Sequence, residues 1–223
     1  MVSITSDILK AKVCGLEQIG RATILLSIQR NDLRFSAGQF FALCAPGSAM
    51  NREYSICSGV NDDTLEFLIR IVDGGVVSPM FSALSIGDVV EIDGPYGEFY
   101  SAMDPSSTLR INCIGTGTGC APFRSVIKTF SGINIRTIHG VRFNEDLYFR
   151  DEFKSAGEYV PCVSRDGSRF SEYKRVTEAV LDLKFDVNES FYLCGNRQMI
   201  TDTIKILLAR GVSADQIFTE VFF

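Results

Sequence analysis

Several residue types and patterns are scarce in this chain of 223 residues, and each absence excludes a class of function. The single histidine, His139, excludes any metal site or mechanism that needs two imidazoles, and with it most zinc hydrolase chemistry. A serine or cysteine triad with one histidine stays open. The seven cysteines form no CxxC pair, so the spacing of zinc and iron–sulfur sites is missing. We expect no metal, and free thiols in a reducing, cytoplasmic compartment.

Long apolar runs and an excess of positive charge are also missing. No stretch approaches the roughly 20 apolar residues that span a bilayer, and the first residues lack a basic start followed by an apolar run. Lys and Arg number 22 against 27 Asp and Glu, which gives a net charge of −5. We therefore expect neither a nucleic-acid partner nor a membrane partner.

The hydrophobic pattern changes partway along the chain and predicts two domains. Residues 8–100 contain six short apolar segments separated by Gly, Pro, Asn and Asp, which is typical of an antiparallel β-barrel. One helix is expected there, over 78–88, ended by Gly87. From residue 109 onward strand and helix patterns alternate, which indicates a parallel α/β sheet. We place the domains at 1–103 and 104–223, with a cleft between them.

Two turns follow predicted parallel strands and carry glycine. Residues 115–124 (GTGTGCAPFR) open a helix, whose free N–H groups suit a phosphate. An ordinary glycine-rich turn is the alternative, because the segment is neither a Walker A loop nor a GxGxxG motif with its acidic partner. Residues 193–199 (LCGNRQM) form the second turn, at the sheet edge where open α/β folds bind ligands. Cys194 is then either a buried space-filler or a neighbour of a reacting ring.

Other segments combine cations, hydroxyls and aromatic rings. Residues 163–169 (VSRDGSR) offer arginines suited to a 2′-phosphate, or form a solvated basic loop. Alternation sends Arg52 and Tyr54 to one strand face, where they would hold a phosphate and a flat ring or form a surface pair. Residues 70–81 (RIVDGGVVSPMF) lead into the short helix and offer a pyrophosphate site or a plain turn.

The order of these segments resembles the ferredoxin–NADP⁺ reductase superfamily. REYS, IRIVDGGVVSPMF, GPYGEF, GTGTGCAPFR, VSR, LCGNRQM and EVFF follow one another within residues 37–223. RFSAGQF and IHGVRFNEDLYF are most similar to the bacterial-type ferredoxin (flavodoxin) NADP⁺ reductases. The resemblance implies an FAD-binding barrel, an NAD(P)-binding α/β domain, and an enzyme that transfers electrons between NADPH and ferredoxin, flavodoxin or another iron–sulfur carrier by hydride transfer to flavin.

The resemblance also implies roles for residues of the first domain. Arg52 would bind the flavin pyrophosphate, Tyr54 would pack on the isoalloxazine, and Ser55 would hydrogen-bond near its reactive nitrogen. The residues that would line the ring and adenylate are Ile69, Arg70 and Ile71. The residues that would cradle the phosphates are Gly75, Val76, Val77 and Ser78.

In the second domain the resemblance implies a nicotinamide site and a terminal aromatic stack. The residues that would contact the nicotinamide nucleotide are Thr116, Gly117, Cys194, Gly195 and Met199. The residues that would bind the 2′-phosphate are Ser164 and Arg165, helped by Arg169 and Tyr173. Glu220 would organise the reaction site with Ser55 and Cys194 as the catalytic group, and Phe222 with Phe223 would cover the flavin. Plant-type relatives end in tyrosine at the position of Phe222.

Two other functions remain open. One is an NADH-dependent reductase component that feeds an oxygenase through a separate iron–sulfur protein. The other is a catalytically silent subunit that binds flavin and nucleotide, against which the joint presence of Ser55, Cys194 and Glu220 argues. Arginines that would dock an acidic carrier, if folding gathered them on one face, are Arg21, Arg30, Arg34, Arg124 and Arg150.

Overall fold

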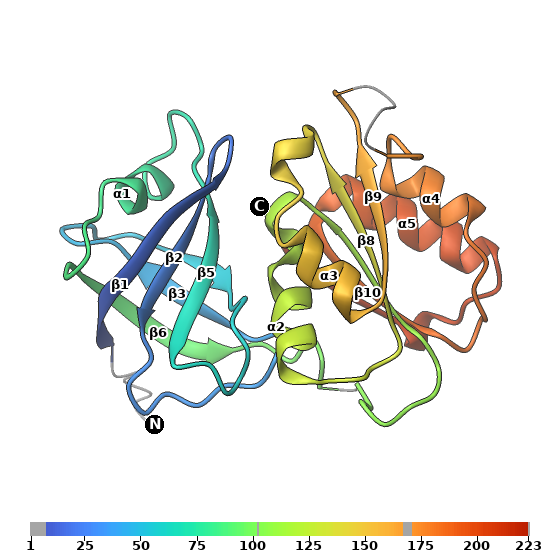
Figure 1. Ribbon diagram of the computed structural model, residues 1–223, viewed down its shortest axis with the longest axis horizontal. Coiled ribbons are helices and arrows are strands. Elements are labelled where there is room, and N and C mark those ends of the chain that lie inside the picture. The colour runs from blue at the N-terminus through green and yellow to red at the C-terminus, as the bar shows by residue number, and fades with distance from the viewer. Residues whose placement is uncertain (1–7, 102, 167–170, 223) are drawn as a thin grey trace, which may run out of the picture.

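The computed structural model describes residues 8–101, 103–166 and 171–222, which form two units side by side (Figure 1). The first unit is a six-stranded antiparallel sheet in the order β4-β3-β6-β1-β2-β5. Its strands are β1 (Leu9–Gly20), β2 (Thr23–Gln29), β3 (Phe40–Cys44), β4 (Asn51–Ser55), β5 (Thr64–Arg70) and β6 (Val89–Tyr96). A bridge between Ile56 and Phe67 joins the two edges of this sheet, so the sheet closes into the expected barrel.

The helix of the barrel domain is shorter than its sequence predicts. Helix α1 spans Ser78–Ser82 and ends well before Gly87. The backbone N–H of Ser85 is bound by the Asp88 carboxylate, and that of Gly87 by the Val13 carbonyl of β1. Since these donors are committed to a turn and to β1, the helical ladder cannot continue to Gly87.

The second unit is a five-stranded parallel sheet in the order β11-β10-β7-β8-β9. Its strands are β7 (Ile111–Thr116), β8 (Ile135–Val141), β9 (Glu158–Val163), β10 (Ser190–Asn196) and β11 (Ile217–Phe222). The helical elements are η1 (Gly117–Cys120), α2 (Ala121–Thr129), η2 (Asn144–Asp146), α3 (Arg150–Ala156), α4 (Val176–Asp182), α5 (Arg197–Ala209) and η3 (Ala214–Gln216). The chain reverses its strand order between β7 and β10, and such a switch point is where open α/β sheets bind ligands.

The helices cover both faces of this sheet (Figure 1). Buried side chains of α2 and α3 share one cluster, and those of α4 and α5 share another. The sequence pattern predicts a helix over residues 172–183 (EYKRVTEAVLDL), but α4 begins only at Val176, because Tyr173 forms a parallel bridge with Cys162. Extended backbone at Tyr173 is incompatible with an earlier helix start.

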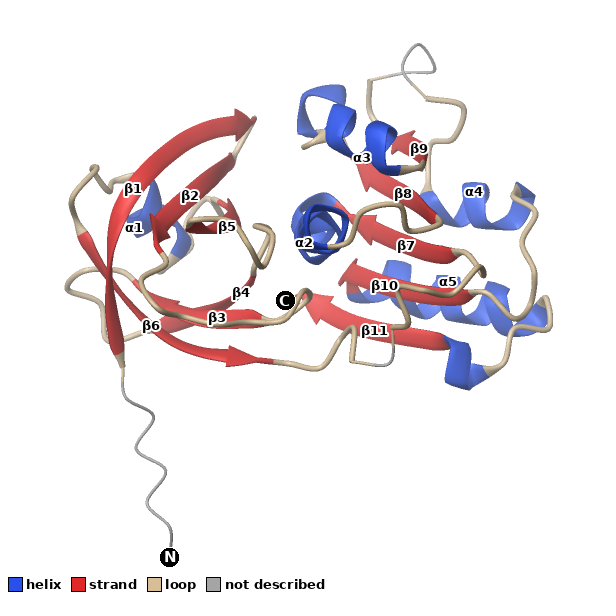
Figure 2. Cartoon of the chain, turned by 60° about the horizontal axis from the view of Figure 1, so that its bottom comes forward, coloured by secondary structure: helices blue, strands red, loops and turns tan. Residues whose placement is uncertain are grey.

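One apolar cluster joins the barrel to the α2 face of the sheet. Its barrel-side members are Ala37, Cys57, Leu68, Phe99 and Tyr100. Tyr100 stacks on Tyr192 at 4.4 Å between ring centroids, and Tyr192 stacks on Phe218 at 4.7 Å. The carboxyl ends of β10 and β11 point toward the barrel (Figure 2). This edge of the sheet is therefore fixed against the barrel by packed rings.

Two further features of the structure concern the cysteines and the helices. All seven cysteines are free. Within the residues that the structure describes, no helix combines the length and the apolar character needed to cross a bilayer.

Gly119 marks the tightest approach between the turns that follow β7 and β10. A Cβ atom at Gly119 would meet the Cys194 carbonyl, 2.7 Å from its carbon, and lie 2.9 Å from the Gly195 Cα. Because both neighbours are backbone, we expect Gly119→Ala to lower the free energy of unfolding by about 3 kcal/mol in urea titrations.

Gly132→Ala is the matched control for this substitution. Gly132 has φ +74°, and a Cβ atom added there would have nothing within 4 Å, so only the left-handed backbone costs free energy, about 1 kcal/mol. Equal losses in the two variants would contradict a specific close approach at Gly119.

Candidate active site

Three side chains from three strands meet where the sheet faces the barrel. The Ser55 hydroxyl at the end of β4 donates to Glu220 Oε2 at 3.1 Å, and the Cys194 thiol of β10 lies 3.8 Å from the same oxygen. Cys194 and Glu220 are direct neighbours in the parallel register of β10 and β11. The structure therefore brings together the three residues assigned to catalysis, although they lie far apart in sequence.

Burial sets the protonation of this group. It raises the pKa of Glu220 to about 7, against the hydrogen bonds from Ser55 and Cys194, which lower it, while the nearby Glu53 charge adds to the rise. Burial also holds the pKa of the Cys194 thiol well above its usual value, and the Glu220 charge acts in the same direction. Cys194 is thus a neutral donor rather than a thiolate nucleophile, and Glu220 exchanges a proton near neutral pH.

The two glycine-containing turns interlock beside this group. Gly195 has φ +123°, and a Cβ there would lie 2.6 Å from the Thr116 hydroxyl oxygen. That oxygen accepts a hydrogen bond from the Asn196 N–H at 3.1 Å. The Asn196 side chain in turn caps α5 by accepting from the N–H groups of Gln198 and Met199. Thr116, Gly195 and Met199 are therefore held together at the strand switch point.

His139 anchors the first of these turns, a role that sequence reasoning missed. Its ring is fully buried, and Nε2 donates to the Gly117 carbonyl at 2.9 Å. Nδ1 is left to accept the Tyr159 hydroxyl at 3.3 Å. Burial lowers the pKa of His139 to about 4, so the neutral ring holds Gly117, whose φ is +56°, at ordinary pH. No sequence motif signals this role, because the partners are 22 and 20 residues away.

The barrel side carries groups that suit a diphosphate and a planar ring. The Arg52 guanidinium is exposed, and its Nη1 donates to the Asn51 carbonyl at 2.7 Å. The half-buried Tyr54 ring packs edge-on against Phe81 of α1 at 5.6 Å. The N-terminus of α1 has no side-chain cap and no acidic residue in its first turn. Arg52 therefore offers a cation to a diphosphate and Tyr54 a half-buried ring to a planar group, and FAD fits these side chains.

Other predicted flavin residues differ in what they offer a ligand. The side chains of Ile69 and Val77 are buried in the barrel core, so these residues can contact a ligand only through backbone groups. Ser78 accepts the Val72 N–H at 3.0 Å, and Gly75 donates to the Val72 carbonyl at 2.9 Å. The remaining side chains, all at least partly exposed, are Arg70, Ile71 and Val76. The turn before α1 is thus ordered by its own hydrogen bonds, with side chains on its outer surface.

The predicted 2′-phosphate residues lie at the end of β9, three strands away from Cys194 and about 14 Å across the sheet. Ser164 bonds to the Val141 carbonyl through both its N–H and its hydroxyl, and the Arg165 N–H donates to the Arg142 carbonyl at 2.8 Å. Arg142, directly after β8, adds an exposed cation beside Arg165. Sequence reasoning missed it, although an arginine at a strand end was the signal.

The remaining predicted residues, which include the additional 2′-phosphate residues and the chain end, differ in how the structure places them. The Tyr173 hydroxyl donates to the Asp182 carboxylate at 2.6 Å, so a phosphate would have to compete for it. Phe222 packs against the apolar cluster between the domains, on the same strand face as Glu220. Arg169 and Phe223 lie outside the described residues. The predicted docking arginines are not one surface set, because Arg124 is buried.

The raised pKa of Glu220 predicts a pH-dependent stability. Its usual pKa is 4.5, so its contribution is fully present below pH 4.5 and is lost as pH rises through about 7. We expect Glu220→Gln to remove this loss, so that the variant gains about 2 kcal/mol relative to the parent between pH 4.5 and pH 8, after allowance for solvent screening. Urea unfolding of both proteins at several pH values measures this gain.

Thr219→Ser, at the exposed neighbouring position, is the control and should follow the parent at every pH. His139 titrates in all three proteins and cancels in the comparison. A constant difference in the free energy of unfolding between Glu220→Gln and the parent across this range would contradict a half-buried, proton-binding Glu220.

Comparisons with known proteins agree with both halves of this architecture. Residues 10–100 match the Oxidoreductase FAD-binding domain family, and residues 113–205 match the Oxidoreductase NAD-binding domain family. A ferredoxin NADP⁺ reductase from Neisseria gonorrhoeae, with bound FAD and NADP, superposes with a TM-score of 0.85 at 26% identity, over 97% of this chain and 99% of that one. An Amycolatopsis cytochrome P450 reductase gives 0.86 at 30% identity, over 98% and 71%.

Curated relatives are longer than this chain. The toluate 1,2-dioxygenase electron transfer component of Pseudomonas putida is 29% identical, over 96% of this chain and 67% of its own length. The reductase subunit of an aromatic O-demethylase from Amycolatopsis sp. is 32% identical, over 96% and 69%. The chain thus spans about two thirds of these relatives. The predicted fold and family are confirmed: the chain belongs to the ferredoxin–NADP⁺ reductase superfamily and is an oxidoreductase with an FAD-binding and an NAD-binding domain.

Proposed function

We propose that this chain is a flavoprotein reductase that carries electrons from NADPH to a one-electron carrier, ferredoxin or flavodoxin. The observation that supports it most is the group of Ser55, Cys194 and Glu220, assembled from both domains around one carboxylate oxygen. A catalytically silent subunit would have no need of a proton-exchanging carboxylate at the domain boundary. Bound FAD would supply the chemistry that side chains lack, since flavin takes two electrons from a nicotinamide and returns them singly.

The residues of the chain would bind, orient and exclude water. Arg52 neutralises a diphosphate, and Tyr54 offers its ring face to a planar ring. Phe222, beside Glu220, would cover that ring and move aside to admit a nicotinamide, as a gate rather than a catalyst. Glu220 exchanges a proton near neutral pH, and the Ser55 hydroxyl that donates to its Oε2 can turn toward a ligand.

Coenzyme choice would depend on the turns after β8 and β9. Arg142 and Arg165 place two exposed cations on adjoining turns joined by a backbone hydrogen bond, an arrangement suited to a 2′-phosphate. Asp166 next to them carries the opposite charge, but its carboxylate accepts the Asn144 N–H at 2.5 Å. Two exposed cations against one carboxylate leave these turns with an excess of positive charge, which supports NADPH over NADH.

A second candidate is an NADH-dependent component that feeds an oxygenase through a separate iron–sulfur protein. Several curated relatives are named as reductase or electron transfer components of oxygenases, which favours this candidate. The two candidates share the flavin site and differ in coenzyme and electron acceptor.

An anaerobic titration separates these candidates. The purified protein is titrated with NADPH and, in a fresh sample, with NADH, while bleaching of the visible flavin band is followed. We expect bleaching at much lower NADPH concentration, which would justify assays with ferredoxin and flavodoxin. Preferential bleaching by NADH would favour the oxygenase component, and a purified chain without a flavin band would overturn the proposal.

Arg165→Ala tests the 2′-phosphate site directly. Loss of one charged hydrogen bond should cost about 1.5–3 kcal/mol of transition-state binding, which lowers kcat/KM for NADPH roughly 10- to 150-fold. The kcat/KM for NADH should stay nearly unchanged. Arg34 is an exposed arginine of the barrel domain, so Arg34→Ala is the control and should change kcat/KM for neither coenzyme. Equal losses with both coenzymes would refute a 2′-phosphate role.

A further inference from the structure

Arg124 is a buried arginine at the boundary between the domains. It is the fourth residue of α2, the helix that begins directly after the glycine turn 115–120. Only 7% of its surface is exposed, and burying a guanidinium is costly unless its donors are paired. Its partners therefore identify what the buried charge does.

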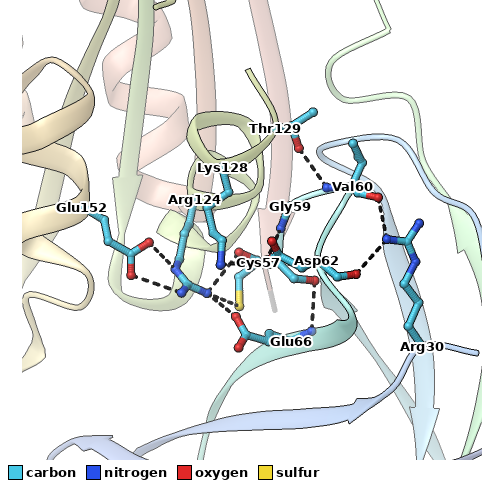
Figure 3. Close-up of polar contacts among 11 residues, drawn as sticks. Arg30, Cys57, Gly59, Val60, Asp62, Glu66, Arg124, Lys128, Thr129 and Glu152 are labelled. Carbon is cyan, nitrogen blue, oxygen red and sulfur yellow. Dashed lines mark hydrogen bonds and ion pairs between the residues drawn. The ribbon is translucent and has the colours of Figure 1, made fainter. Parts of the chain in front are cut away.

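Those partners come from both domains (Figure 3). Toward the barrel, Nη1 donates to Glu66 Oε2 of β5 at 2.6 Å and to the Cys57 carbonyl at 3.2 Å. Toward the α/β domain, Nε and Nη2 donate to the two carboxylate oxygens of Glu152 in α3 at 2.8 and 3.1 Å. One rigid guanidinium thus joins β5, α2 and α3 with defined directions.

An aromatic ring completes the arrangement. The Arg124 guanidinium lies over the Phe149 ring, 4.0 Å from its centroid. Phe149 has φ +56°, a left-handed conformation that costs free energy for a bulky residue. The backbone strain at Phe149 thus occurs where its ring covers the guanidinium and excludes water from it.

The next turn of α2 makes a second set of contacts with the same part of the barrel. Lys128 pairs with Asp62 at 2.7 Å, and the Thr129 hydroxyl accepts the Val60 N–H at 3.1 Å. From the other side, Arg30 donates to the carbonyls of Val60 and Asp62 (Figure 3). Residues 57–63 of the barrel are therefore held between α2 and the end of β2.

The position of this network relates it to the reaction. Glu66 lies on β5, which ends at the predicted flavin residue Arg70, and Arg124 lies on the helix that follows the predicted nicotinamide residues Thr116 and Gly117. The two reacting rings would be bound by different domains and must meet within about 3.5 Å. Apolar packing holds domains together without direction, whereas a bidentate arginine fixes their register.

We propose that Arg124 is a positioning residue that sets the register between the nicotinamide turn and the flavin barrel. This inference rests on the proposed function for its effect on rate. Its structural half, a directional link between residues 57–63 and α2, does not depend on that function.

The test uses Arg124→Lys, which keeps the charge but cannot bridge Glu66 and Glu152 with one fork, and Glu66→Gln as a second variant that perturbs the network less. Arg136→Lys is the matched control. Arg136 is as buried as Arg124, but its partners Glu158, Asn112 and Lys184 all lie in the α/β domain. Each variant is compared with the parent by stopped-flow flavin reduction and by the dissociation constants of coenzyme and flavin. Thermal unfolding and amide hydrogen exchange without coenzyme complete the comparison.

We expect Arg124→Lys to lower the rate constant of flavin reduction at saturating NADPH by about 10- to 100-fold, with both dissociation constants within about threefold of the parent. Amide exchange should accelerate in residues 57–63 and in α2. Arg136→Lys should lower the thermal midpoint but leave the rate constant of flavin reduction and the amide exchange of these two segments unchanged. A fall in the thermal midpoint alone for both Arg124→Lys and Glu66→Gln, with rate constant and exchange unchanged, would overturn the proposal.

The two hypotheses fail in different ways. A parent protein that binds no flavin would refute the proposed function, and the exchange comparison would still decide the link. Faster exchange in both segments for Arg124→Lys but not for Arg136→Lys would support the link, and unchanged exchange would overturn it.

Discussion

The packing of the barrel against the carboxyl ends of the parallel strands is the constraint on which the rest of the structure depends. Glu220 is largely shielded from solvent, and hydrogen-bonded by Ser55, only because a strand of one domain reaches β4 of the other. The stacked rings of Tyr100, Tyr192 and Phe218 are part of the apolar contact. Without this contact Glu220 would be a solvated carboxylate with an ordinary pKa, and the candidate active site would not exist.

This contact also explains why one strand face carries both chemistry and covering aromatic groups. Alternation along β11 directs Phe218, Glu220 and Phe222 toward the barrel. The opposite set, Ile217 and Val221, packs with the α4 and α5 layer. A single strand therefore supplies an aromatic anchor in Phe218, a proton-binding group in Glu220 and, in Phe222, the ring that the proposed function makes a cover for the flavin. Shifting its register by one residue would exchange all three for side chains of the opposite face.

The sequence predicted those parts that depend on local pattern. All six barrel strands, the five parallel strands and the glycine turns were visible, because periodicity and turn residues act over a few positions. The predicted end of α1 at Gly87 and the predicted start of α4 at residue 172 were wrong, since the Gly87 N–H bonds to β1 and Tyr173 forms a bridge with Cys162. His139 and Arg124 could not be assigned roles, because their partners are distant in sequence. The roles of the catalytic and cofactor residues stay predictions.

The buried charge of Arg124 raises the question why an apolar side chain does not occupy its place. Replacing a buried ion pair by well-packed apolar groups is often neutral or stabilising, so stability alone does not explain it. An apolar contact at this position would add to a cluster that already joins the domains. Such a cluster tolerates small slides of one surface over the other, whereas a fork that binds Glu66 and Glu152 at once does not. Where two ligands held by separate domains must be placed to within a fraction of an ångström of their reacting geometry, restricting that slide contributes more than additional apolar contact.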